Sequence, residues 1–119
     1  MIEYGARTRP MPAPADIVFD DLASPRATGT RAWLLLLDDE RPPTVIESDR
    51  PRHLVWSSLW TKRPEDRVVL DLTTGSRGDS RLGFTLLAAG DPPDEALTGH
   101  IRKRINQLLF AGLRSTYGQ

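Results

Sequence analysis

The stretch TVIESDRPRHLVWSSLW, residues 44–60, decides how this chain can fold. It holds two runs rich in β-branched and aromatic residues, and the turn-forming letters SDRP separate them. In the second run, alternation places four side chains on one strand face: Leu54, Trp56, Ser58 and Trp60. The stretch therefore predicts an antiparallel hairpin with a tryptophan-rich face, which is either ordinary core or one wall of a pocket.

Three further runs predict strands, at residues 2–9, 67–75 and 80–90. The first is an edge strand, because glycine and flanking prolines weaken it. The other two each have one apolar face, and GSRGD between them is a hairpin loop. The residues on those two faces are Val68, Leu70, Leu72, Leu82, Phe84 and Leu86. Five strands in an antiparallel meander with one apolar side follow from this pattern.

Two short helices are predicted between the first strand and the hairpin. Pro14 suits the first turn of one helix, and Val18 and Leu22 share its apolar face at i and i+4. Ser24-Pro25 then ends this helix and can open a second. The run at residues 30–37, with Trp33 and four leucines, fits either a buried strand or a buried helix, and the start signal at Ser24 favours helix.

The longest predicted helix begins after Asp91-Pro92-Pro93 and runs from Asp94 to about Tyr117. An apolar stripe of period 3.6 follows it, made of Leu97, Ile101, Ile105, Leu108 and Gly112. Phe110 lies on the opposite side, with Leu113 and Tyr117 near it, so the helix end is apolar on two sides. Either this end also packs against the first strand and first helix, or it forms a homodimer contact through Phe110, Leu113 and Tyr117.

These elements predict an α+β fold in one domain, residues 1–119. The apolar side of the meander must be covered, and only the C-terminal helix is long enough to cover it. A curved antiparallel sheet gripping a long helix results. Because a curved sheet and a straight cylinder do not fit flush, such a fold can leave a cavity between them.

Several phrases of the chain resemble those of the SRPBCC superfamily, the START-like, helix-grip group that includes polyketide cyclases. They are MPAPADIVFDDLASP, TVIESDRPRHLVWSSLW and SRLGFTL. The resemblance covers about residues 2–117 and implies an internal cavity for a small molecule. The family usually has six or seven strands, whereas this chain has five, because a hairpin before Val45 is absent or shortened.

Composition narrows the classes of function. The 119 residues carry a formal net charge of zero, which does not favour binding to nucleic acid or to an anionic membrane. The chain has no cysteine, so disulfides and thiolate chemistry are excluded. We expect no signal peptide, because the first ten residues carry Glu3 and no apolar run, and the longest apolar run, residues 32–37, is too short to span a membrane. A cytoplasmic protein is expected.

The candidate ligand-binding residues are those predicted to face the space between sheet and helix. They are Trp33, Trp56, Ser58, Trp60, Phe84, Ile101, Ile105 and Leu108. Aromatic side chains on one strand face together with a small hydroxyl are typical of a pocket that orients a ligand. The same aromatics also serve as ordinary core.

The polar residues considered as candidates do not form a recognisable catalytic or metal-binding motif. His53 and His100 are the only histidines, and no His, Asp or Glu stands beside them at metal-ligand spacing, so no metal and no cofactor are expected. Asp71 falls on the outer face, where we expect it to be either solvated or paired with Arg81 across the hairpin. The basic cluster HIRKR, residues 100–104, suits a solvated helix face.

Three functions remain open. The leading interpretation is a small domain that binds a hydrophobic, apolar or aromatic, small molecule between sheet and helix. The second is an enzyme resembling a polyketide cyclase or aromatase, which would need a positioned acid or base inside. The third is a protein-interaction module whose cavity is filled by its own side chains.

Overall fold

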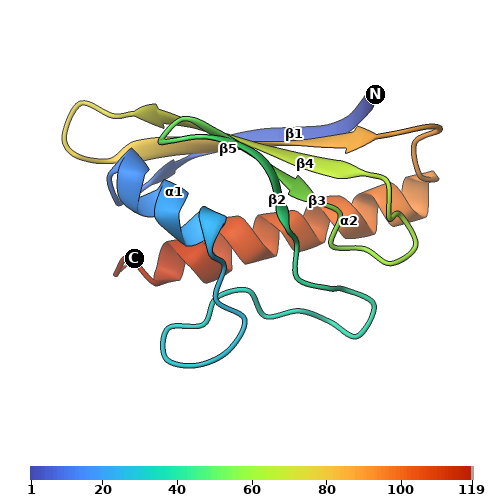
Figure 1. Ribbon diagram of the computed structural model, residues 1–119, viewed down its shortest axis with the longest axis horizontal. Helices are drawn as coiled ribbons and strands as arrows, with labels where there is room; N and C mark the ends of the chain where they lie inside the picture. The colour runs from blue at the N-terminus through green and yellow to red at the C-terminus, as the bar shows by residue number, and fades with distance from the viewer. Residues whose placement is uncertain (119) are drawn as a thin grey trace.

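The computed structural model describes residues 1–118. Its elements follow in the order β1 (Ile2–Met11), α1 (Ala15–Ala23), β2 (Val45–Asp49), β3 (His53–Ser57), β4 (Arg67–Thr74), β5 (Ser80–Ala88), α2 (Glu95–Gln107) and η1 (Leu108–Leu113). One five-stranded antiparallel sheet forms a layer above the C-terminal helix, and α1 closes one end (Figure 1). The predicted α+β helix-grip fold is confirmed.

The sheet has the order β1-β5-β4-β3-β2, so the strand nearest the N-terminus is an edge strand, as predicted. In β4 and β5 alternate residues are buried, which confirms the apolar face. Asp71 lies on the outer face, but the predicted pairing with Arg81 is wrong. Register places Arg81 opposite Thr73, and the Asp71 carboxylate instead contacts His53 Nδ1 on β3 at 2.8 Å.

The predicted strand through Trp60 ends earlier, at Ser57. Ser58 Oγ accepts a hydrogen bond from the backbone N–H of Trp60 at 3.1 Å, which bends the chain. Leu59 and Trp60 are consequently both buried, at 0% and 2% exposure, although strict alternation would put them on opposite faces.

Residues 24–44, here called the connecting segment, contain no helix or strand. The prediction of a second short helix starting at Ser24-Pro25 is therefore wrong. The backbone takes positive φ at Gly29 (86°) and Arg31 (64°), which interrupts any helix. The leucine run is not uniformly buried either, since Leu34 is 1% and Leu35 64% exposed. The segment lies as an extended loop beside the helix (Figure 1).

The C-terminal helix is continuous, but it changes type. After α2, residues Leu108–Leu113 form a π-helix, η1. Leu108, Leu109 and Leu113 are all buried, and Leu109 and Leu113 follow Ile105 at steps of four residues, so they continue the buried side of the helix. Asp94 caps the N-terminus of α2, because its carboxylate accepts from the N–H of Leu97.

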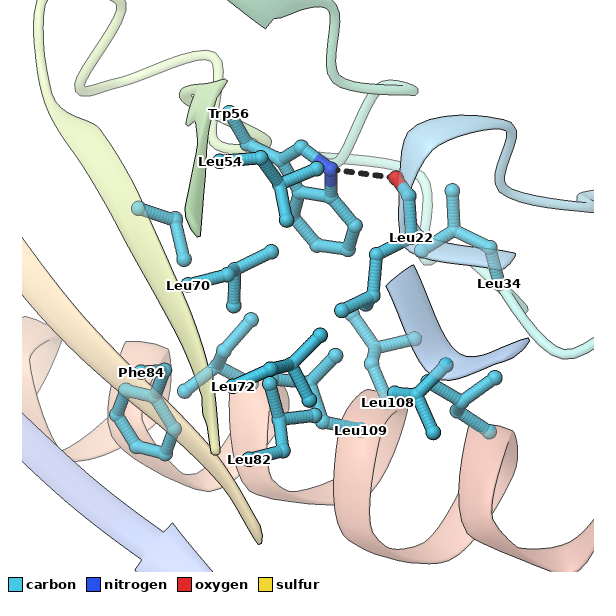
Figure 2. Packing of buried hydrophobic residues seen from close by; sticks show 14 of the residues in the cluster. Leu22, Leu34, Leu54, Trp56, Leu70, Leu72, Leu82, Phe84, Leu108 and Leu109 are labelled. Atoms are coloured by element: carbon cyan, nitrogen blue, oxygen red, sulfur yellow. Dashed lines mark hydrogen bonds between the residues drawn. The ribbon is translucent and has the colours of Figure 1, made fainter. Parts of the chain in front are cut away.

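The core fills the space between the sheet and the C-terminal helix (Figure 2). Leucines from β3, β4, β5 and η1 meet there, and Phe84 lies among them. Trp56 is fully buried, and its indole Nε1 donates to the carbonyl of Leu22 on α1 at 2.9 Å. This bond joins the first helix to the sheet.

Candidate functional site

The eight residues predicted to line a ligand cavity all lie in the interior. Their exposures are 3% or less, which confirms that they face inward, and a ligand-binding role for them stays a prediction. Ser58 does not present a free hydroxyl, because its Oγ bonds the backbone of Trp60. The sheet–helix space is thus packed with side chains where these residues meet.

Trp33 and Trp56 form the aromatic centre of this interior. Their rings stack with centroids 6.3 Å apart and planes inclined by 21°. The two indoles differ in one respect, because Trp56 Nε1 has a partner and the buried Trp33 Nε1 has none among residues 1–118. Leaving a buried donor without a hydrogen bond costs about 1–3 kcal/mol of folding stability. The Trp33 N–H is such a donor.

A pocket of about 170 Å³ adjoins Trp33 on the outer side. It lies where α1, the connecting segment and the end of the C-terminal helix meet. Its other lining residues are Ile17, Asp21, Arg26, Arg31, Thr116 and Tyr117. Of the eight candidate residues only Trp33 lines it, so Trp33 separates the packed interior from this pocket.

Polar groups hold the wall of this pocket together. The Tyr117 hydroxyl donates to Asp21 at 2.7 Å, and Arg31 donates to the Thr116 carbonyl at 2.8 Å. Burial and the bond to Asp21 raise the pKa of Tyr117 above its ordinary range, so its hydroxyl keeps its proton. The pocket therefore has both hydrogen-bond donors and acceptors in its wall, together with the ring of Trp33.

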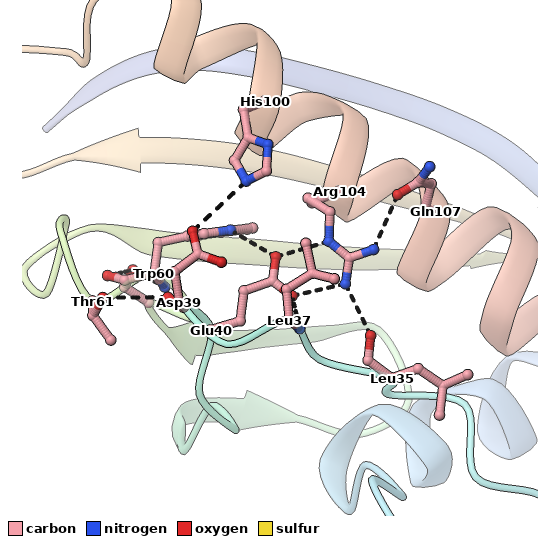
Figure 3. A network of polar contacts seen from close by, with 10 residues as sticks. Leu35, Leu37, Asp39, Glu40, Trp60, Thr61, His100, Arg104 and Gln107 are labelled. Carbon is pink, nitrogen blue, oxygen red and sulfur yellow. Dashed lines mark hydrogen bonds and ion pairs between the residues drawn. The ribbon is translucent and has the colours of Figure 1, made fainter.

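An ion pair fastens the connecting segment to α2 (Figure 3). Arg104 donates to both oxygens of Glu40, through Nη2 at 2.7 Å and Nε at 2.8 Å. Trp60 Nε1 donates to the same carboxylate at 3.1 Å. Arg104 also reaches the Leu35 carbonyl at 2.9 Å, so one guanidinium binds the segment at two points.

The Glu40 carboxylate stays ionised in this setting. Burial alone would raise its pKa, but the hydrogen bonds from Arg104, the Leu37 N–H and Trp60 outweigh burial and hold the pKa below its usual value. A carboxylate so fully engaged is not a general acid or base. Its role is to hold the segment against the helix.

Asp39, Glu40 and His100 come together beside this pair, with one ligand atom of each within 4.8 Å of the others. Sequence spacing could not show this cluster, because the histidine lies on α2. His100 Nε2 is 3.8 Å from Asp39 Oδ2. The Glu40 oxygens already accept from Arg104 and Trp60, and a cation would lie next to a guanidinium. This donor set does not fit a metal ion.

The apolar end of the helix packs within the chain, which is one of the two predicted alternatives. Leu113 is fully buried, so its predicted part in a homodimer contact is wrong. Phe110 packs against Phe84 with ring centroids 6.1 Å apart, and Tyr117 bonds Asp21 on α1. A homodimer through Phe110 and Tyr117 stays a prediction.

Among the described helices, none has the length and apolar character needed to cross a membrane. No protein-family model and no curated protein sequence matches the chain.

Solved structures do resemble it. The Aha1 dimer from Colwellia psychrerythraea has a TM-score of 0.68 at 11% identity, and the match covers 98% of this chain and 96% of that one. CalU16 from Micromonospora echinospora has a TM-score of 0.64 at 16% identity, covering 88% of this chain and 70% of that chain. An HSP90 activator from Plasmodium falciparum has a TM-score of 0.61 at 13% identity, covering 92% and 89%.

The chain has the SRPBCC fold. At these identities the likeness concerns the fold and leaves the ligand open.

Sequence reasoning missed Glu40 and Arg104. Glu40 lies in DDERPP, which was interpreted as a break between two elements. Arg104 lies in HIRKR, which was interpreted as a solvated helix face. The signal available was an acidic triplet, residues 38–40, directly after the leucine run, but only the docked segment brings Glu40 and Arg104 together.

Proposed function

We propose that the protein binds a small apolar or aromatic molecule at the sheet–helix interior, reached through the pocket at Trp33. The observation that supports this most is the position of Trp33. Its ring stacks on Trp56 inside, it lines the outer pocket, and its buried N–H lacks a partner. A ligand with an acceptor atom would satisfy this donor.

The volume available suits only a small group as the protein stands. The pocket of about 170 Å³ is smaller than the roughly 300–1,000 Å³ of drug-sized sites. A larger ligand needs the connecting segment to move, and this segment has no helix or strand of its own to break. The Glu40–Arg104 pair is its fastening and would stay in place while residues 26–33 shift.

The test uses the three indole N–H signals, one from each tryptophan, in a ¹⁵N-correlated NMR spectrum. The probe is 2-naphthol, a neutral aromatic with one acceptor oxygen. Trp33→Phe identifies the Trp33 signal and removes the donor, while leaving an aromatic ring. We expect a saturable shift of the Trp33 signal, a smaller shift for Trp56, and weaker probe binding by Trp33→Phe.

Native mass spectrometry of the purified protein provides a second readout, because a retained small molecule would add mass to the chain. If saturating 2-naphthol moves neither the Trp33 nor the Trp56 signal, the proposal is wrong, and the interior serves only as core.

The enzyme alternative gains no support from the interior. Within residues 1–118 the buried carboxylates are those of Glu40 and Asp66, and each is bound to an arginine. The interaction-module alternative is favoured by one observation, the packed space around Trp56. It predicts that no probe enters.

A further inference from the structure

A second groove lies on the other side of the helix end, between β1 and η1. Its volume is about 310 Å³. Three arginines line it, Arg7 and Arg9 from β1 and Arg114 after η1, together with Phe110 and the amides of Asn106 and Gln107. It shares no lining residue with the pocket at Trp33.

The fold brings these arginines together. Arg7 and Arg9 are two residues apart on a strand, so they project from the same face, and Met11, next on that face, is buried in the core. β1 is the edge of the sheet, so no further strand covers these two side chains on the open side. The helix supplies Arg114 and the ring of Phe110 opposite them.

The charge in the groove is not balanced locally. No carboxylate lines it, and within residues 1–118 none of the three arginines forms an ion pair. Arg7 donates only to Asn106 Oδ1, at 3.3 Å. Elsewhere Arg50, Arg63 and Arg104 each hold a carboxylate. The chain as a whole has zero formal net charge, so the excess of positive charge is a property of this place.

Phe110 gives the groove an apolar wall of fixed position. Its ring is tilted by 35° against Phe84, at a centroid distance of 6.1 Å, and it remains only partly buried. A ligand that fits must therefore carry negative charge at one end and an apolar or aromatic surface at the other.

We propose that this groove binds a small phosphate monoester that carries an aromatic or apolar group. A phosphate dianion matches several guanidinium groups, whose planar donors bind phosphate oxygens in pairs. The groove volume of about 310 Å³ is at the lower end of small-molecule sites, roughly 300–1,000 Å³, so it has room for a ligand of this size.

The test is calorimetric titration with 1-naphthyl phosphate, and the comparison ligands are inorganic phosphate and 1-naphthol. We expect the ester to bind more tightly than either half and its affinity to fall with added salt. Arg7→Gln and Arg114→Gln should each weaken it about tenfold, since each removes charge-assisted hydrogen bonds. Arg77→Gln, in the β4–β5 loop and outside both lining sets, is the matched control and should bind like the unmodified protein.

A parallel arm asks where such a phosphate comes from. Co-sedimentation with phosphatidylcholine vesicles, with and without phosphatidate, distinguishes a lipid headgroup from a free ester. Binding in either arm that depends on Arg7 and Arg114 supports the site. The proposal is overturned if neither arm shows binding, or if binding persists unchanged in Arg7→Gln and Arg114→Gln.

Discussion

Arg104 on α2 and Glu40 on the connecting segment form a two-point ion pair, at 2.7 and 2.8 Å, although 64 residues separate them in the chain. Their side chains are 11% and 0% exposed. The pair therefore lies largely out of water, where losing one partner is costly. It connects a segment without regular structure to the most regular element of the fold.

Arg104→Ala should lower the free energy of unfolding by about 3–5 kcal/mol, because Glu40 is left buried without its partner. Urea denaturation followed by tryptophan fluorescence measures this. Arg102→Ala, two residues earlier on the exposed side of α2, is the control and should change stability by less than about 0.5 kcal/mol. Equal losses in the two variants would show that the ion pair does not fasten the segment.

The same pair predicts a pH dependence. The pKa of Glu40 is lowered in the folded protein, so its contribution is fully present above the ordinary glutamate pKa of about 4.3. It is lost as the pH falls through the lower folded value. Glu40→Gln should therefore be less stable than the unmodified protein at neutral pH, and the difference should shrink in acid.

Thermal unfolding at a series of pH values checks this prediction. Asp20→Asn is the control, because Asp20 pairs with Arg50 at the surface, with side-chain exposures of 57% and 54%. An exposed pair contributes little, so this variant should follow the unmodified protein. A constant difference between Glu40→Gln and the unmodified protein down to acid pH would contradict the assignment.

Gly112 allows the connecting segment to approach the helix. A Cβ at this position would lie 2.8 Å from the backbone oxygen of Trp33. Gly112→Ala should destabilise the protein by about 1–3 kcal/mol through overpacking. Gly99→Ala, on the exposed side of α2 with nothing within 4 Å, should instead be neutral or stabilising by up to about 1 kcal/mol. Thermal melting of the two variants gives the comparison, and similar shifts would refute the close contact.

Trp56 is fully buried, so Trp56→Ala should cost about 3–5 kcal/mol. Trp56→Phe keeps an aromatic ring but removes the donor to the Leu22 carbonyl, and should cost about 1–3 kcal/mol. Chemical denaturation measures both variants. A small loss for Trp56→Ala would mean that the ring borders open space, contrary to the packing in Figure 2.

Much of the fold could be read from the sequence, because local periodicity states which face of an element is apolar. The alternation in β4 and β5 and the stripe through Ile101 and Ile105 are confirmed by burial. The edge position of β1 followed from its glycine and prolines. A sheet with one apolar side and a single long helix leaves few ways to assemble.

The helix predicted in the connecting segment was wrong for a physical reason. A run of leucines has no period, and only the tertiary structure decides which of its members are buried. Leu34 enters the core, while Leu35 and Leu37 remain 64% and 47% exposed. The turn at Ser58 likewise depends on a hydroxyl bond to the backbone that alternation does not predict.

The sequence pattern is enough to establish that five strands and one long helix share an apolar interface, since the pattern repeats every two residues in a strand and every 3.6 residues in a helix. How this interface is closed, and where unpaired polar groups remain, follows from tertiary packing. Glu40 meets Arg104, Trp33 stacks on Trp56, and three arginines line one groove because distant segments pack together. Such contacts depend on loop paths that carry no periodic signal, so a sequence pattern cannot state them.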